Sequence, residues 1–324
     1  MRRHSVAALA ILVLTPAVAW AAQRDLEKTW RVPVTAGEHV IVDGGNANVT
    51  VRAGDVLQAV LTAQLHISGV SEETADSWLA DNTPRIDNAK DHVRITVTPF
   101  HKGLLSLAHL TAHADLSLVA PISVVPDITT RNGDIKLRGD FPSADPLRLR
   151  SADGKIEMTG AAISVDVRTT GGDARVEVVR PLERLFARTA NGDVTLTGGA
   201  REVHVDTASG DVWLNNLSGD AEVATSSGKI TLHWDRLDPS HSVRIRATKG
   251  VIQLIIPDDV KPQGELRTTT GTIRCDLPAK ITEEGRVVTL EGDGPRLDVE
   301  SATGEIVLSH RDEGWEASPA PLGQ

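Results

Sequence analysis

Three aspartates directly follow a glycine in three consecutive repeats of the sequence. They are Asp173, Asp193 and Asp211, spaced 20 and 18 residues apart. Calcium prefers carboxylate oxygens, so a row of stacked aspartates could bind it. The alternative is a solvated row of turns, because Lys155 and Lys229 occupy the equivalent positions on either side and offset repulsion between the carboxylates. Calcium-binding β-rolls also repeat about every nine residues. We therefore expect the solvated row and no cofactor.

A second set of residues is basic and stands four positions before a glycine. Its members are Arg150, Arg168 and Arg188. Forked guanidinium donors could bind an acidic glycan or a phosphate. The nearby Asp166 and Asp206 offer a different role for them, namely diagonal ion pairs on a strand surface. We favour ion pairing and regard the three aspartates and three arginines as speculative binding residues.

The remaining reactive side chains give weaker signals. His109 and His113 are four residues apart, which would form one edge of a metal site if the segment were helical, but the sequence places no third ligand beside them. Cys275, the single cysteine, falls in an apolar column of the repeat, which favours a buried hydrophobic role. No catalytic motif is present. We expect no metal site, no catalytic residue and no enzymatic activity.

These side chains belong to a repeat with a period of about 20 residues, which is typical of stacked repeat architectures. Its pattern is hydroxyl-x-x-Gly-x-apolar-x-apolar, as in residues 189–196 and 207–214. The pattern is centred on nine glycines: Gly133, Gly154, Gly172, Gly192, Gly210, Gly228, Gly250, Gly271 and Gly304.

The columns of the repeat predict strands on both sides of each glycine. Positions two and four after the glycine are apolar in every unit, and the position between them is mostly polar. This alternation indicates a strand with one buried face. Glycine supplies turn angles that other residues resist. The hydroxyl three positions earlier, replaced only at Ala247, is expected to bond the turn backbone. We predict an all-β fold, a β-solenoid resembling a parallel β-helix, with nine or more coils and one short helix near the N-terminus.

The chain divides into four segments. A signal peptide is predicted by the positive start at Arg2 and Arg3, an apolar run at residues 6–14 and a small-x-small cleavage pattern at Ala19-Trp20-Ala21. The long gap before Gly304 predicts a hairpin-like excursion around residues 286–290 and 296–299. The predicted boundaries are a signal peptide at 1–22, an irregular β region that caps the solenoid at 23–126 with its helix at about 71–80, regular repeats at 127–309 and a disordered tail at 310–324.

Composition narrows the choice of partners. The net charge is −10 and aromatic residues make up 3% of the chain. An acidic chain is a poor ligand for nucleic acid and for anionic membrane surfaces. No stretch after the signal segment is long and apolar enough to span a bilayer. We expect an exported protein in the periplasm or at the cell surface.

The repeat units at residues 189–196 and 207–214 resemble those of the DUF4097 family of bacterial β-strand-repeat proteins, over about residues 39–309. That resemblance implies an adhesin-like role, or one similar to the LiaG-like proteins associated with envelope stress. It assigns no catalytic residue. We expect a non-enzymatic interaction or adhesion-like module whose partner is an envelope protein or a glycan. The alternatives are an envelope-stress accessory protein that binds a membrane or regulatory partner, and a glycan-active β-helix enzyme.

Overall fold

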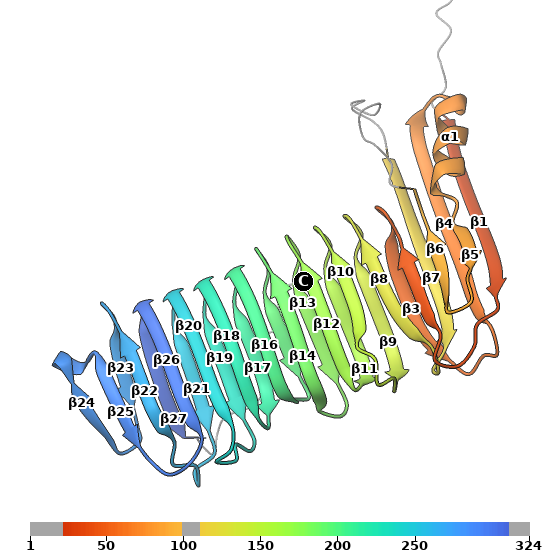
Figure 1. The fold of residues 1–324 in the computed structure, drawn as a ribbon. Coiled ribbons are helices and arrows are strands. Elements are labelled where there is room, and N and C mark those ends of the chain that lie inside the picture. Colours follow the sequence, from red (N-terminus) through yellow and green to blue (C-terminus); the bar gives the residue numbers. More distant parts are fainter. Residues whose placement is uncertain (1–21, 99–110, 311–324) are drawn as a thin grey trace, which may run out of the picture.

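The computed structural model describes residues 22–98 and 111–310. Three predicted features lie outside these ranges: His109, residues 1–21 of the signal peptide and residues 311–324 of the tail. Within them the protein is a rod made of two long β-sheets that face each other (Figure 1).

Sheet A has 13 strands. In spatial order they are β1 (Ala22–Val32), β4 (Ala59–Val70), β7 (Thr111–Pro121), β3 (Asn48–Gly54), β9 (Ile135–Phe141), β11 (Ile156–Ala162), β13 (Ala174–Val178), β15 (Val194–Thr197), β17 (Val212–Leu217), β19 (Ile230–Trp234), β21 (Ile252–Ile256), β27 (Glu305–His310) and β23 (Thr272–Cys275).

Sheet B has 14 strands. In spatial order they are β24 (Ala279–Thr282), β25 (Val287–Glu291), β22 (Gln263–Thr268), β26 (Arg296–Thr303), β20 (Ser242–Lys249), β18 (Asp220–Ser227), β16 (Ala200–Ser209), β14 (Leu182–Thr189), β12 (Ser164–Thr169), β10 (Leu147–Ser151), β8 (Val125–Thr130), β2 (His39–Asp43), β6 (His92–Thr96) and β5 (Arg85–Asn88).

Each regular coil gives one strand to sheet B, turns at its repeat glycine and gives one strand to sheet A. Equivalent residues of successive coils pair in parallel register, for example Val194 with Val212 in sheet A and Thr207 with Thr225 in sheet B. The apolar columns fill the space between the sheets, and Val212 is only 1% exposed. The predicted all-β solenoid is confirmed.

Close stacking of the turns requires the repeat glycines. A Cβ atom on Gly172 would lie 2.1 Å from the carbonyl oxygen of Gly154, and one on Gly192 would lie 2.0 Å from that of Gly172. Neither Gly172 nor Gly192 has a positive φ, although Gly210 and Gly228 do. The explanation from turn angles is therefore incomplete. Neighbouring turns approach so closely that a side chain has no room between them.

The hydroxyl three positions before the glycine is buried and steadies the turn. Gly172 N–H donates to Thr169 Oγ1 at 3.1 Å, and Thr169 Oγ1 donates to the carbonyl oxygen of Gly154 in the preceding coil at 3.4 Å. The predicted structural role is confirmed at this position. Within the described residues, the buried hydroxyls of Thr207 and Ser301 have no hydrogen-bond partner.

The N-terminal strands join the same two sheets and end them differently. β4 pairs antiparallel with β1 on one side and with β7 on the other, and helix α1 (Glu72–Asn82) packs against β1 and β4 at this end of the rod (Figure 1). Thr74 N–H donates to Ser71 Oγ at 3.3 Å, so Ser71 is the N-cap of the helix. Its buried residues are Ala75, Trp78 and Asn82, which face the two strands.

At the opposite end the spatial order of the coils departs from the sequence order. β26 and β27, the last strands along the chain, lie between the coil of β20 and β21 and the coil of β22 and β23. β24 and β25 form an antiparallel hairpin around a 3₁₀ turn at Glu283–Gly285 and extend sheet B beyond β22. The predicted excursion is therefore half right, since residues 296–299 belong to a parallel strand of the rod and not to a hairpin.

Candidate functional site

The three predicted aspartates do form a row along the turns, and their carboxylates bond the backbone of the next coil. Asp193 N–H donates to Asp173 Oδ1 at 3.1 Å, and Asp211 N–H donates to Asp193 Oδ1 at 2.7 Å. Lys229 N–H donates to Asp211 Oδ1, also at 2.7 Å. Each carboxylate thus accepts a hydrogen bond from a backbone N–H and links two neighbouring turns. The row is a connection between coils rather than a merely solvated surface.

A lysine of the neighbouring coil lies beside this row of aspartates, as the sequence predicts. Lys155 Nζ lies 3.8 Å from Asp173 Oδ2. In residues 22–98 and 111–310, no group of three or more histidine, cysteine, aspartate or glutamate side chains could hold a metal ion. The expectation that the protein uses no cofactor stays a prediction.

The three predicted arginines lie next to one another on the outer face of sheet B. They are Arg150, Arg168 and Arg188. Arg168 donates two hydrogen bonds to the carboxylate of Asp166, at 3.0 and 3.1 Å, and Arg188 Nε donates to Asp206 at 3.1 Å. Arg150 donates to Asp127 at 3.1 Å. The predicted ion pairing is confirmed, and these guanidinium groups are engaged by their own neighbours.

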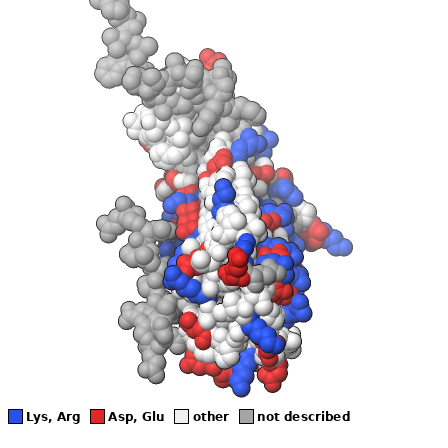
Figure 2. All heavy atoms as spheres, turned by 90° about the vertical axis from the view of Figure 1, so that its left-hand side faces the viewer, with Lys and Arg blue, Asp and Glu red and all other residues white. Residues whose placement is uncertain are grey.

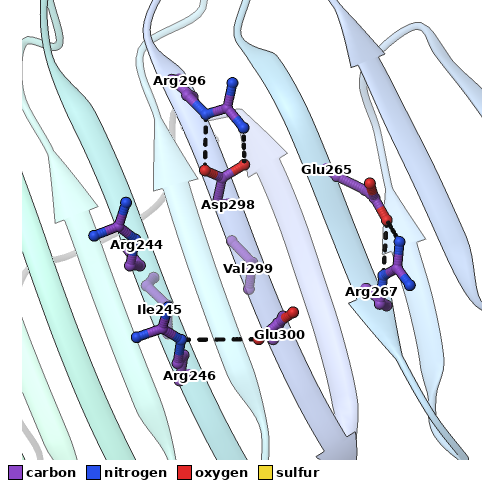
Figure 3. A pocket seen from close by; sticks show the side chains of 9 residues that line it. All are labelled: Arg244, Ile245, Arg246, Glu265, Arg267, Arg296, Asp298, Val299 and Glu300. Atoms are coloured by element: carbon purple, nitrogen blue, oxygen red, sulfur yellow. Dashed lines mark hydrogen bonds and ion pairs between the residues drawn. The ribbon is translucent and has the colours of Figure 1, made fainter.

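Further along the same face, the surface of sheet B is hollowed over β20, β26 and β22 (Figure 3). This depression, the sheet-B groove, has a volume of about 290 Å³. Its charged lining residues are Arg244, Arg246, Glu265, Arg267, Arg296, Asp298 and Glu300.

Two arginines of the sheet-B groove are held tightly by carboxylates. Arg296 donates two hydrogen bonds to Asp298, at 2.8 and 3.1 Å, and these bonds raise the pKa of the guanidinium above its already high value. Arg267 Nε donates to Glu265 at 2.8 Å. Both cations are therefore permanently charged and fixed in position.

The other two arginines, both on β20, are held loosely. Arg244 lies 4.0 Å from the carboxylate of Glu222, and Arg246 lies 3.8 Å from that of Glu300. Both separations are too long for a hydrogen bond. Among the described residues, neither guanidinium makes a side-chain hydrogen bond, so both keep forked donors for an anionic ligand.

A short side chain widens the groove on one side. In its row across sheet B, Ala224 stands between Asp206 and Arg246. A second hollow of about 440 Å³ opens there and shares Arg246, Arg267 and Glu300 with the first. The two hollows together form one depression across β16, β18, β20, β26 and β22.

The insertion of β26 sets the charge pattern of the groove. Arg246 pairs in register with Glu300, and Glu300 pairs in register with Arg267. If the coils stacked in sequence order, the two arginines would be neighbours and would repel each other. The inserted strand places a carboxylate between them.

The sequence contains one signal for this groove. Arg246 and Arg267 stand four positions before Gly250 and Gly271, as the three predicted arginines stand before their own glycines. The arginine column is interrupted by Asp206 and Ala224 and resumes in the C-terminal coils. What the sequence hides is the strand that separates the last two members.

His113 lies on strand β7, so the helical condition for a metal edge is not met at this residue. His109 lies outside the described residues. The His113 ring stacks on that of His66 with centroids 4.8 Å apart, and His66 Nδ1 lies 2.6 Å from Asp25 Oδ1. The hydrogen bond with His66 lowers the pKa of Asp25.

Cys275 is half-buried rather than fully buried, because it lies on β23, the last strand of sheet A. The column is apolar as predicted, but no further coil of sheet A covers it. Burial still raises the pKa of its thiol, which lowers the thiolate fraction at neutral pH.

Comparison with known proteins supports the family assignment for the C-terminal part. Residues 182–309 match the family model described as Toastrack DUF4097, which confirms the predicted resemblance over that range. The comparison with curated proteins gives no significant match. No helix in the described part of the chain has the length and apolar character needed to cross a membrane.

Several solved structures are similar to the whole rod at low sequence identity. A "putative lipid binding protein" from Parabacteroides distasonis is 11% identical, with a TM-score of 0.51 over 87% of this chain and 96% of that chain. A "putative adhesin" from the same organism is 12% identical, with a TM-score of 0.47 over 88% and 97%. Another from Bacteroides fragilis is 11% identical, with a TM-score of 0.44 over 88% and 97%. At these identities the likeness concerns the fold.

Proposed function

We propose that this protein is an exported, non-enzymatic interaction module of the cell envelope that binds an acidic glycan on the outer face of sheet B. The observation that carries the proposal is the pair of loosely held arginines in the sheet-B groove. Arg244 and Arg246 project from one strand into a depression whose other cations are already neutralised. Carboxylate or phosphate groups along a glycan would meet two forked donors there.

The shape of the face suits an extended ligand. The groove continues into the second hollow, so its lining spans five neighbouring strands of sheet B. Strands lie about 4.8 Å apart, so the lining follows a polymer over roughly 20 Å. The structurally similar protein from Parabacteroides distasonis is named a putative lipid binding protein, which is also a binding function.

An array of acidic and neutral cell-wall and exopolysaccharide fragments tests the proposal. We expect saturable, salt-sensitive binding of acidic fragments and no change in fragment length after incubation. The double variant Arg244→Ala/Arg246→Ala is expected to weaken binding about tenfold or more, because each guanidinium supplies charge-assisted hydrogen bonds.

A matched control uses two arginines of sheet B that are already paired. Arg184 lies 2.9 Å from Glu202, and Arg201 lies 3.2 Å from Glu183. The double variant Arg184→Ala/Arg201→Ala should bind like the unaltered chain. Equal losses in both double variants would refute the groove as the site. Shortening of the glycan would instead indicate a glycan-active enzyme, and retention of one membrane protein from an envelope extract would indicate an accessory role.

A further inference from the structure

The C-terminal end of the rod carries a separate, apolar hollow between the two sheets. It has a volume of about 520 Å³, within the range of small-molecule sites. Val260, Pro262, Leu277 and Leu290 form its buried floor. We call this hollow the terminal pocket.

The topology explains why apolar surface is left open here. Sheet A ends at β23, whereas sheet B continues past β22 with β25 and β24. β25 still contacts β23 of sheet A, but β24, the last strand of sheet B, lies beyond the end of sheet A. Ile281 shows the effect, since it pairs in register with buried Val288 and yet is 66% exposed.

The charge pattern of this end separates a mainly uncharged centre from a charged border. Seen from the end of the rod where β24 and β25 lie, mostly uncharged surface runs down the middle with a few charged side chains within it, and further lysine, arginine and acidic side chains lie along its sides (Figure 2). An apolar depression inside such a border is the arrangement expected for an amphiphilic ligand.

The rim of the terminal pocket has one cation that the protein itself does not neutralise. Lys280 pairs with Glu291, and Asp258 lies 3.9 Å from His310. Lys261 is exposed at the same rim and forms no ion pair with any described residue. A negatively charged group held above the apolar floor would complement Lys261.

We propose that the terminal pocket binds a free long-chain carboxylic acid, with its acyl chain on the floor of Val260, Leu277 and Leu290 and its carboxylate at Lys261. Binding at this site is independent of the sheet-B groove, because the two share no lining residue. The rod then carries two ligands of different chemistry near the same end.

The test titrates the full chain with dodecanoate and follows heat or displacement of a fluorescent apolar probe. Saturable one-to-one binding is expected, and octanoate should bind far more weakly, since each buried methylene is worth about a fourfold change in affinity. Ala279→Trp, which fills the pocket, should abolish binding of both dodecanoate and 1-dodecanol. Lys261→Ala should weaken dodecanoate about tenfold and leave 1-dodecanol unchanged.

Lys261 is exposed, so its variant keeps the test decisive even if Ala279→Trp disturbs folding. Absence of saturable dodecanoate binding by the unaltered chain would overturn the proposal, and so would equal effects of Lys261→Ala on dodecanoate and 1-dodecanol. Sedimentation with phosphatidylcholine–phosphatidylglycerol vesicles without dodecanoate binding would overturn it in favour of a membrane surface. The groove variant Arg244→Ala/Arg246→Ala should bind dodecanoate normally, which separates this result from the glycan test.

Discussion

Replacing Gly172 by alanine tests whether close stacking of the turns, rather than turn angle, demands the repeat glycine. The new Cβ would lie 2.1 Å from the carbonyl oxygen of Gly154 and 2.5 Å from its carbonyl carbon. The adjacent Gly171 is the matched control, because the nearest contact of its Cβ would be the flexible carboxylate of Asp153 at 3.1 Å, and the nearest backbone atoms would lie at ordinary contact distances of 3.6 and 3.8 Å. Neither Gly171 nor Gly172 has a positive φ.

The expected magnitude follows from the size of the overlap. Carbon atoms that are not bonded to each other normally lie at least about 3.5 Å apart. The turns of Gly172 and Gly154 would therefore have to separate by about 1 Å or more. Overpacking of this kind costs about 1–3 kcal/mol, occasionally more, and Gly154 cannot rotate away because the atoms in contact are backbone. Reduced entropy of the unfolded chain returns roughly 0.4–1 kcal/mol. We expect a net loss of about 2 kcal/mol for Gly172→Ala and a change within about 1 kcal/mol, of either sign, for Gly171→Ala.

Urea unfolding followed by circular dichroism measures both variants. Repeat proteins can unfold in parts, so hydrogen exchange at the amides of β11 to β13 should accompany the melts. Faster exchange should be confined to these coils in Gly172→Ala. Equal stability of the two variants, or a larger loss in Gly171→Ala, would refute the steric explanation.

Four other predictions concern single side chains. Asp211→Ala should cost about 1 kcal/mol, because the next coil loses a charged acceptor, whereas Asp211→Asn keeps an acceptor and should cost less than about 0.5 kcal/mol in the same urea melts. Val212→Asp, one residue away, should cost more than about 3 kcal/mol, because it buries an unpaired charge; comparable losses for Val212→Asp and Asp211→Ala would contradict the assignment of faces. The lowered pKa of Asp25 means that its stabilising effect is present at neutral pH and is lost as the pH falls through the folded-state pKa; NMR titration should show that pKa rising toward the ordinary value of an aspartate in His66→Ala, and no change would exclude the hydrogen bond as the cause. Cys275 should react with a disulfide reagent at pH 8 at least about ten times more slowly when folded than in urea, because burial raises the pKa of its thiol; equal rates would show that the thiol is accessible.

The columns of the repeat were predictable because each has a simple physical requirement. An inward position must be apolar, as Val212 and Leu214 are, and parallel stacking repeats that requirement in every coil. The ion pairing of Arg168 and Arg188 was predictable for the same reason, since acids stand at neighbouring outward positions. Asp211 illustrates the limit. Its outward position predicts that a substitution would barely change the stability of the fold. The structure shows that its carboxylate accepts a hydrogen bond from a backbone N–H of the next coil.

The position of the last coil was not predictable from the columns. Every regular coil presents the same apolar columns and the same turn to its neighbours, so β26 could pair with β20 or with β22 by pattern alone. In the structure it pairs with both. The position of β26 depends on the hairpin of β24 and β25, which leads the chain back past β22. The residue pattern within a single repeat does not contain this path of the chain.

Both candidate sites arise from this one break in the regular order. In the regular coils the inward columns are filled, and outward arginines such as Arg168 and Arg188 are bonded by adjacent carboxylates. Insertion of β26 places Glu300 between Arg246 and Arg267 and leaves Arg246 3.8 Å from its carboxylate. The hairpin that makes the insertion possible carries sheet B beyond the end of sheet A and so leaves the terminal pocket open. The repeat builds the rod, and the C-terminal exception to the repeat creates both surfaces to which we assign ligands.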